Sequence, residues 1–530
     1  MGDINSSASS PLFTLSLCLC IPLFFVIFHF LSNSRSRAKS TPCPQSYPII
    51  GNLPGLLRNS YRFHDWVADM LSQTPSSTIQ VRTFLGLSHG ICTANPTNID
   101  HLLHSNFPNY IKGSRFRHFL TELLGDGIFN VNGHLWTLQR KIASHEFNTK
   151  SLKHFISEAV RSEISDRLIP YLSAACDENR VIDLQDILQR FTFDNICHVA
   201  FGVNPACLTS DNMYQNLPSS NFVKAFDDAV DISSSRFLSP LPLIWKLKRF
   251  FNIGSEKRYK EAIKVINHYA MEIIRSKEQE QEQAEDSKET LKDQDLLSRF
   301  MFSSLNVAFQ DEEHKRKFLR DIVISFILAG RDTTSTALTW FFWLISGHPR
   351  CACLIQTELE SVPEKDRGIF NYEELKKLHY LHAALTESMR LFPPVPINSR
   401  TAVQDDILPD GTQVRKGWFA DYSAYAMGRM DKVWGDNCRE FIPERWLDVN
   451  GIFQLSDQFR FPVFHSGPRI CLGKEMAYVQ MKSIAATVLY EFDIVAVDGG
   501  ASAEKMMNPP YMLSLVLKMR GGLPVRLRRR

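Results

Sequence analysis

The sequence of 530 residues contains no C-x-x-C pair and no dinucleotide-binding fingerprint of the form G-x-G-x-x-G. The first absence argues against a cysteine-ligated zinc site, and the 11 cysteines are too irregularly spaced to give a disulfide framework. The second absence indicates that the chain does not carry its own dinucleotide cofactor. We therefore expect mostly reduced thiols that face a cytosolic environment.

An excess of one charge is also missing, because 60 basic and 57 acidic residues leave a formal net charge of +3. No basic cluster is interleaved with stacking aromatic residues, which excludes a nucleic-acid-binding surface and indicates a mixed, solvated one. With 44% hydrophobic and 22% charged residues, the chain can bury a substantial core and is typical of a globular protein.

One long apolar run is present, from Pro11 to Leu31, and it contains no Asp, Glu, Lys or Arg. Its length suits a helix that crosses a bilayer core. Basic residues follow it between positions 35 and 39, and the positive-inside bias would keep the rest of the chain in the cytoplasm. A cleaved signal peptide would instead place its basic residues before the run. The sequence therefore predicts a retained N-terminal membrane anchor at residues 1–31.

The next segment, residues 32–58, is basic and rich in proline, with prolines at positions 42, 44, 48 and 54. Because proline fixes φ and lacks a backbone N–H, these residues argue against helix and predict a stiff, extended linker to a body at residues 59–530. An ordinary surface loop is the alternative, which the prolines alone do not exclude.

Helical periodicity dominates the middle of the chain, from Ser151 to Leu391. Within it, residues 321–346 are apolar on all faces, which predicts a long and buried central helix. Extended segments are expected at 77–86, 400–417 and 511–530, the last with a hairpin turn at its paired glycines 521 and 522. We therefore predict a mainly α fold with small β-sheets behind an N-terminal transmembrane helix.

The stretch FPVFHSGPRICLGKE, at residues 461–475, places a cysteine between two glycines and just before a predicted helix. An ionised sulfur bound to a metal needs backbone N–H groups and a helix N-terminus directed at it. Gly467 allows a turn with positive φ, Gly473 lets the backbone approach the sulfur, and Arg469 can reach an anionic group. This stretch therefore predicts a chemical role for Cys471, although a free cysteine is more often a small buried hydrophobe.

Phe464, Gly467, Arg469, Cys471 and Gly473 form the pattern F-x-x-G-x-R-x-C-x-G, which resembles the signature of the cytochrome P450 haem-thiolate monooxygenases. The resemblance covers essentially the whole chain. It implies the cytochrome P450 fold, haem b (iron protoporphyrin IX) as the cofactor, and Cys471 as the proximal ligand of the haem iron. It also implies that Phe464, Arg469 and Gly473 contact the cofactor.

A second motif matches the family's structural Glu-Arg-Arg network. Glu387 and Arg390 are three residues apart on one predicted helix face, where they can form an ion pair. Arg445, in the segment FIPERW, matches the third member. The resemblance implies that these three residues brace the cysteine loop without direct chemistry.

The segment AGRDTT lies in the predicted central helix and carries the third motif. Ala329 and Thr333 are four residues apart and share a face. The resemblance implies that Ala329 leaves space over the iron, and that Asp332 and Thr333 relay protons to bound oxygen. The alternative is a threonine that bonds to its own helix beside an acid in a salt bridge. The other motifs favour the catalytic interpretation.

Trp136 and Arg140 form a W-x-x-x-R pair with a spacing that places both on one helix face. The resemblance implies that they hold one haem propionate, and Arg400 is a candidate for the second. Elsewhere, a Trp/Arg pair at this spacing is more often plain surface packing.

Since the chain has no dinucleotide site, its electrons must come from a separate protein. The resemblance implies the membrane-bound NADPH-cytochrome reductase of the endoplasmic reticulum, with Lys474 and Arg439 as candidate docking residues. Together with the anchor, this implies a single-pass protein of the endoplasmic reticulum membrane whose catalytic domain is cytosolic.

Segments such as NFPNYIKG (106–113) and SAYAMGRMDKVWG (423–435) resemble the plant branch of the family that hydroxylates terminal carbons. Its members act on fatty acids, on jasmonoyl-isoleucine, or on sterol side chains at C-26. The first is the expected substrate and the other two are alternatives. Candidate residues for an apolar substrate channel are Phe326, Val395, Ile397 and Leu513, each of which could equally be core.

Two other classes of function stay open at this point. A haem-thiolate hydroperoxide isomerase or dehydratase would need neither oxygen nor a reductase, but such enzymes tend to disrupt the acid/threonine pair, which is intact here. A membrane-anchored haem-binding or sensing protein would not need that pair at all.

Overall fold

Helices make up most of the structure, a computed structural model that describes residues 44–47, 49–83, 89–147, 150–209, 217–239, 242–284, 295–304, 311–362, 368–497 and 506–530. The α-helices are α2 (Leu53–Arg58), α3 (Phe63–Gln73), α4 (Pro96–Asp100), α5 (Ser114–Leu124), α6 (Gly133–Phe147), α7 (Lys150–Glu163), α8 (Ile169–Asp177), α9 (Leu184–Phe201), α11 (Pro218–Leu238), α12 (Pro242–Phe250), α13 (Gly254–Ala284), α14 (Leu296–Ser304), α15 (Glu312–Ile327), α16 (Thr333–Ser346), α17 (Pro349–Ser361), α18 (Tyr372–Lys377), α19 (His379–Leu391), α20 (Ala424–Met427), α21 (Asp431–Trp434) and α22 (Lys474–Glu491). The mainly α fold expected from the sequence is therefore confirmed.

The strands form three sheets: β1 (Thr78–Arg82), β2 (His89–Thr93), β3 (Tyr110–Ile111), β5 (Ile397–Ala402) and β8 (Phe419–Ser423) in one, β4 (Ile182–Asp183), β9 (Phe492–Ala496) and β10 (Pro524–Arg529) in another, and β6 (Asp406–Ile407) with β7 (Gln413–Val414) in the third. The five-stranded sheet has the order β1-β2-β8-β5-β3, in which only β2 and β8 pair in parallel. Arg400, a residue of the site described below, lies in β5 of this sheet and pairs with Ala420 in β8.

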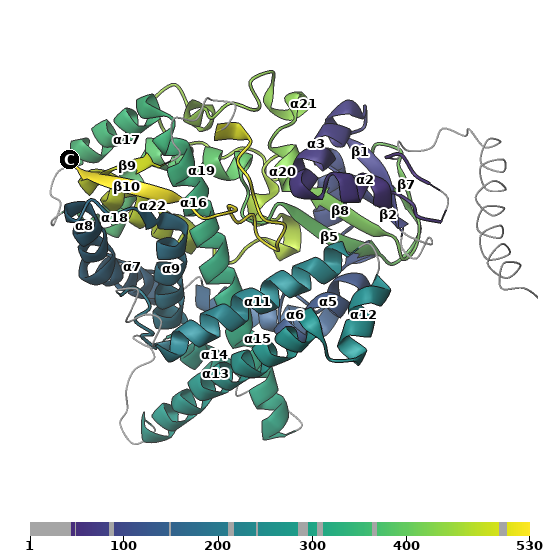
Figure 1. Cartoon of the computed structure of the whole chain (residues 1–530), viewed down its shortest axis with the longest axis horizontal. Helices are drawn as coiled ribbons and strands as arrows, with labels where there is room; N and C mark the ends of the chain where they lie inside the picture. Colours follow the sequence, from purple (N-terminus) through teal and green to yellow (C-terminus); the bar gives the residue numbers. More distant parts are fainter. Residues whose placement is uncertain are drawn as a thin grey trace, which may run out of the picture.

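The central helix is continuous, as predicted. It consists of α15, one π-helical turn at Leu328–Asp332 (η8), and α16, which ends at Ser346 with Gly347 as its C-cap. Asp311 caps its start, because the Asp311 side chain accepts a hydrogen bond from the His314 backbone N–H at 2.8 Å. Figure 1 shows this helix running through the middle of the molecule, and α16 contacts α9, α17, α19 and α22.

Close helix packing fixes the position of the π-turn. A Cβ atom placed on Gly330 would lie 2.5 Å from the Ile196 side chain of α9, so a larger residue would push the two helices apart. The five-stranded sheet lies with α2 and α3 on one side of the central helix in Figure 1, and α7, α8 and α9 lie on the other. The elements that carry the predicted motifs therefore meet around the central helix.

The described residues cover only part of the N-terminal segment for which predictions were made. The anchor predicted at residues 1–31 lies outside the described residues, and no helix that is described has the length and apolar character to span a bilayer. The prediction that prolines exclude helix from 32–58 is wrong for Leu53–Arg58, which forms α2. Pro54 occupies the first turn of that helix, where no intrahelical N–H bond is needed.

The C-terminal hairpin prediction is wrong in its pairing. Gly521 and Gly522 do have positive φ angles of 84° and 78°. However, β10 pairs with β9 and β4, so the chain after the glycines joins the three-stranded sheet instead of returning along residues 511–519, which belong to no sheet. The eight cysteines of the described residues are all free, in agreement with the predicted reduced thiols, and the cytosolic environment stays a prediction.

Candidate active site

The cysteine loop is built from two short 3-10 turns, η10 (Pro462–Phe464) and η11 (Gly467–Arg469), followed by the start of α22. The Cys471 backbone N–H donates to the Phe464 carbonyl at 2.8 Å, which closes the loop. Gly467 has a φ of +63°, and a Cβ there would lie 2.0 Å from the Leu103 carbonyl oxygen. Only glycine fits this position, so the prediction for Gly467 is confirmed.

Groups around the Cys471 sulfur stabilise its anionic form and so oppose the effect of burial. Burial raises the pKa of the Cys471 thiol, while the Gly473 backbone N–H, Arg140 and Lys474 act to lower it. The side chain nevertheless keeps an accessible face. A Cβ on Gly473 would lie 4.0 Å from the sulfur, so this glycine keeps the space beside it open. A metal ion on the open face would stabilise the thiolate.

Positive side chains gather next to this loop. Arg400 is buried, and none of its three guanidinium nitrogens has a hydrogen-bond partner among the described residues. Burial, Arg400 and Arg140 together lower the pKa of Arg469 to about 9. Burial also lowers the pKa of Lys112 well below its usual value, and Arg400 and Arg469 add to the effect. Four cations therefore repel one another in a place with little solvent.

Arg469 and Trp136 hold each other in place at the edge of this cation cluster (Lys112, Arg140, Arg400 and Arg469). The guanidinium carbon of Arg469 lies 4.5 Å from the centroid of a Trp136 ring. Arg469 also donates to the Val131 carbonyl at 2.7 Å and to the Asn132 side chain at 3.0 Å. The structure thus brings together the residues that the sequence assigned to propionate binding.

This arrangement fits haem. Buried guanidinium groups without hydrogen-bond partners are costly unless an anion completes them, and haem carries two propionates. The carboxylate of Asp421 opposes the repulsion at Lys112, as Cys471 does at Arg140 and Tyr422 does at Arg400. The cation cluster would hold the propionates, and Cys471 would hold the iron.

Two residues of this region escaped the sequence analysis, Lys112 and His465. His465 lies in the cysteine loop with a φ of +59°, and burial followed by Arg400 and Lys112 lowers its pKa well below the usual value. Its Nδ1 contacts the Tyr422 hydroxyl. Lys112 precedes Gly113 in the segment NFPNYIKG, but no local pattern marks it as a ligand.

The central helix approaches the cysteine loop through α15, the segment just before its motif. Leu472, adjacent to the cysteine, packs on a small apolar cluster that includes Ile322 and Phe326 of α15. The Thr333 hydroxyl donates to the Ala329 carbonyl at 2.6 Å, so the intrahelical bond weighed as an alternative is the one observed. A hydroxyl that donates once still offers its oxygen as an acceptor. π-Turns such as η8 are frequent at functional sites.

Asp332 is completely buried beside Thr333 and belongs to a chain of ion pairs. Its Oδ1 accepts from Arg331 at 3.0 Å, and Arg331 also binds Asp227 at 2.9 Å. Lys518 reaches Asp227 at 3.0 Å. Burial raises the pKa of Asp332, although Arg331 and Lys518 oppose the shift, and its Oδ2 has no hydrogen-bond partner among the described residues. The acid is thus held by one oxygen and has the other available.

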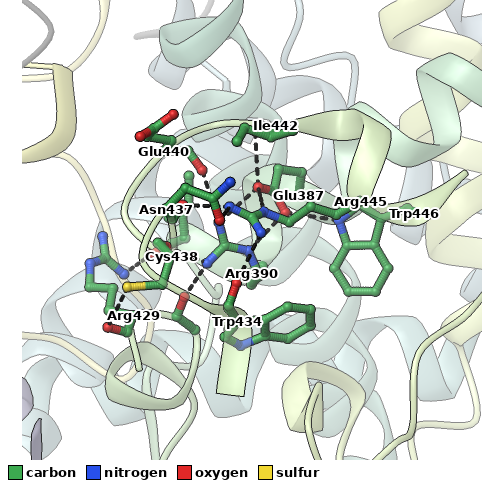
Figure 2. A network of polar contacts seen from close by, with 12 residues as sticks. Glu387, Arg390, Arg429, Trp434, Asn437, Cys438, Glu440, Ile442, Arg445 and Trp446 are labelled. Atoms are coloured by element: carbon green, nitrogen blue, oxygen red, sulfur yellow. Dashed lines mark hydrogen bonds and ion pairs between the residues drawn. The ribbon is translucent and has the colours of Figure 1, made fainter. Parts of the chain in front are cut away.

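The Glu-Arg-Arg network is confirmed and is shown in Figure 2. Glu387 and Arg390 are fully buried and 2.7 Å apart, and Arg445 approaches the same Glu387 oxygen at 3.3 Å. Arg390 also donates to the carbonyl oxygens of Cys438 at 2.6 Å and Glu440 at 3.0 Å. One carboxylate therefore ties α19 to the irregular segment that precedes the cysteine loop.

Replacing Gly467 by alanine is expected to lower the thermal unfolding midpoint by more than replacing Gly451 does. Gly451 has a φ of +75° but nothing within 4 Å of an added Cβ, so its alanine variant suffers backbone strain alone, about 1–2 kcal/mol. Gly467→Ala adds the clash with Leu103. Equal shifts of the two midpoints in thermal unfolding by circular dichroism would contradict the assigned loop geometry.

Replacing Arg400 by glutamine is expected to act in opposite directions on the two forms of the protein. Without haem, removal of one buried cation raises the unfolding midpoint, because repulsion of Lys112 and Arg469 falls. With haem, loss of a charge-assisted bond to a propionate speeds transfer of haem to an acceptor apoprotein about 10- to 100-fold. Arg415→Gln, which removes an exposed pair with Asp405, is the control. A destabilised haem-free Arg400→Gln with normal haem retention would refute the propionate assignment.

The chain is similar to known proteins over nearly its whole length. The family model described as "Cytochrome P450" matches residues 41–521. The chain is 46% identical to cytochrome P450 94A1 of Vicia sativa, with 92% of this chain and 90% of the relative covered. It is 44% identical to cytochrome P450 CYP94D108 of Paris polyphylla, over 92% and 93%, and 42% identical to cytochrome P450 94B1 of Arabidopsis thaliana, over 96% and 95%.

Proposed function

Since this chain belongs to the cytochrome P450 family, in its plant omega-hydroxylase branch, we propose that it hydroxylates the terminal carbon of a long-chain fatty acid. The enzyme is a haem-thiolate monooxygenase with haem b, and NADPH supplies its electrons through a separate reductase. One oxygen atom of O₂ enters the substrate C–H bond and the other leaves as water, at the expense of two electrons and two protons.

The proposed roles of the residues follow from the contacts described above. Bound haem supplies the iron that activates dioxygen and inserts one oxygen atom into the substrate. Cys471 holds that iron through its thiolate, and Arg140, Arg400 and Arg469 bind the propionates. The oxygen of Asp332 that has no hydrogen-bond partner among the described residues, and the hydroxyl of the next residue, Thr333, would pass protons inward from the chain of ion pairs.

An apolar cavity of about 880 Å³ supports the substrate class. Side chains from α3, β1, α5 and β5 line it, among them Trp66, Ile79, Phe119 and Ile397. A smaller cavity shares Ile397 and Phe119 with the first and is also lined by Leu513. Ile397, a predicted channel residue, thus lines a cavity of a size typical for small-molecule ligands, and Leu513 lines the smaller cavity next to it.

The other two predicted channel residues do not line either of these cavities. Phe326 packs in the core, with ring centroids 6.3 Å from Phe147 and 6.1 Å from Phe300. Val395 is half-buried at the turn that precedes β5 and does not line either of these cavities.

Product analysis of a lipid panel tests the proposal. The haem-loaded enzyme with reductase, NADPH and oxygen is expected to convert a fatty acid to its omega-hydroxy acid, identified by mass spectrometry. Jasmonoyl-isoleucine and a hydroxysterol serve as parallel substrates. Oxidation of either of these with no product from any fatty acid would replace the proposed substrate, and conversion of a fatty acid hydroperoxide without NADPH would indicate an isomerase or dehydratase.

We further propose the topology of an anchored enzyme: an anchor at 1–31, a linker at 32–58, and a catalytic domain at 59–530 that faces the cytosol from the endoplasmic reticulum membrane. The last residues of the linker already pack on the domain, since the Asn52 side chain bonds the Arg82 backbone N–H at 2.7 Å. Lys474 and Arg439 remain the proposed reductase contacts, although Arg439 also approaches Asp69 at 3.7 Å.

A further inference from the structure

Charge is distributed unevenly within the substrate space. The large cavity is lined by four basic side chains and a single carboxylate: Arg82, Arg115, Arg117, Lys246 and Asp421. No lysine or arginine lines the small cavity, whose surface comes mainly from Phe, Leu, Ile and Ser side chains, with Asp421 and a buried histidine. The large cavity therefore has an excess of positive charge, and the small one does not.

This distribution fits an anionic amphiphile better than a neutral lipid. A cation that faces an apolar cavity loses hydration, and a carboxylate that enters with an apolar chain restores a partner to it. A sterol offers no such anion. The lining of the large cavity places the carboxylate at the basic side chains and the apolar chain on the aromatic and aliphatic ones.

Among the basic residues of the large cavity, Arg115 has a guanidinium donor without a hydrogen-bond partner and no carboxylate within hydrogen-bond distance in the described part of the chain. Its guanidinium carbon lies 4.1 Å from the Phe419 ring centroid and 4.5 Å from that of Phe237, so two aromatic faces hold it in place. It approaches Asp421 only at 3.8 Å, which is too long for a hydrogen bond. Its Nη1 is buried without a hydrogen-bond partner among the described residues.

Its neighbour Arg117 differs because it already has a carboxylate partner. Arg117 lines the same cavity, two residues along α5, but it donates to the Asp126 carboxylate at 3.1 Å and is 44% exposed. Its charge is therefore already paired. The two arginines offer a comparison in which Arg117 already donates to a carboxylate and Arg115 does not, since its distance to Asp421 is 3.8 Å.

We propose that Arg115 binds the carboxylate of a long-chain acid in the large cavity, with the apolar chain packed on the aromatic and aliphatic side chains that line the same cavity. This inference deepens the proposed function and rests on it for the identity of the carbon that is oxidised. It selects substrates with a free carboxylate, which fatty acids and amino-acid conjugates have and sterols lack.

Equilibrium dialysis of the haem-loaded full chain with hexadecanoic acid and its methyl ester tests the proposal. The wild-type protein is expected to bind the acid more tightly than the ester. Arg115→Gln should weaken binding of the acid about 10- to 100-fold and change that of the ester by less than about 2-fold, since only the acid makes the charge-assisted bond. Arg115→Lys should keep part of the preference, and Arg117→Gln should keep nearly all of it.

Three outcomes overturn the inference: equal affinity of the wild-type protein for acid and ester, an equal loss of both in Arg115→Gln, or the same loss of acid in Arg117→Gln. Product analysis separates this from the proposed function. Omega-hydroxylation without a preference for the acid removes the role of Arg115 alone. An acid preference that depends on Arg115, without omega-hydroxylation, removes the proposed function and leaves the carboxylate site.

Discussion

Cys471→Ser abolishes the red-shifted carbon monoxide band that the ferrous haem protein is expected to show. A thiolate donates electron density to the haem iron, whereas a serine hydroxyl stays protonated and a weak ligand at neutral pH. The loop around it is closed by the Phe464 carbonyl and the Gly467 turn, so serine should occupy the same place without the same bond. Monooxygenase activity should fall below detection.

Cys353→Ser is the matched control, because it removes another free thiol, exposed on α17. It should leave the band and the activity unchanged. Retention of the band in Cys471→Ser would mean that another residue is the axial ligand.

Thr333→Ala is expected to separate consumption of NADPH from formation of product. Haem binding should persist, but without the hydroxyl beside Asp332 the reducing equivalents should leave mainly as hydrogen peroxide. We expect product per NADPH to fall about 10-fold or more, in line with the effect of removing one proton-transfer group. Parallel assays of NADPH, peroxide and hydroxylated product provide the measurement.

The control lies in the same helix. Thr339 also donates to its own helix, to the Ser335 carbonyl at 2.7 Å, so Thr339→Ala removes the same kind of bond elsewhere in α16. Normal coupling in Thr339→Ala with poor coupling in Thr333→Ala supports the proton role. Normal coupling in both would reduce the Thr333 hydroxyl to an intrahelical partner.

Motifs whose parts are close in sequence could be predicted well. The turn at Gly467 and the start of α22 after Cys471 follow from local backbone requirements, as does the ion pair of Glu387 with Arg390 three residues along one helix. Residue type and spacing already contain that information.

Contacts between distant segments could not be predicted in this way. Lys112 joins Arg400 and Arg469 only because β3 pairs with β5 and the cysteine loop packs near both, and Asp227 reaches Arg331 from another helix. The hairpin prediction failed for the same reason, because the chain after Gly522 pairs with β9 and not with the residues just before it. The helix at Pro54 was missed for a local reason, since proline is compatible with the first turn of a helix.

X-ray absorption at the iron edge of the haem-loaded protein tests the central claim most directly. The account predicts one sulfur atom bonded to iron in the wild-type protein and in Cys353→Ser, and none in Cys471→Ser. Iron without a sulfur ligand in the wild-type protein, or with one in Cys471→Ser, would contradict it.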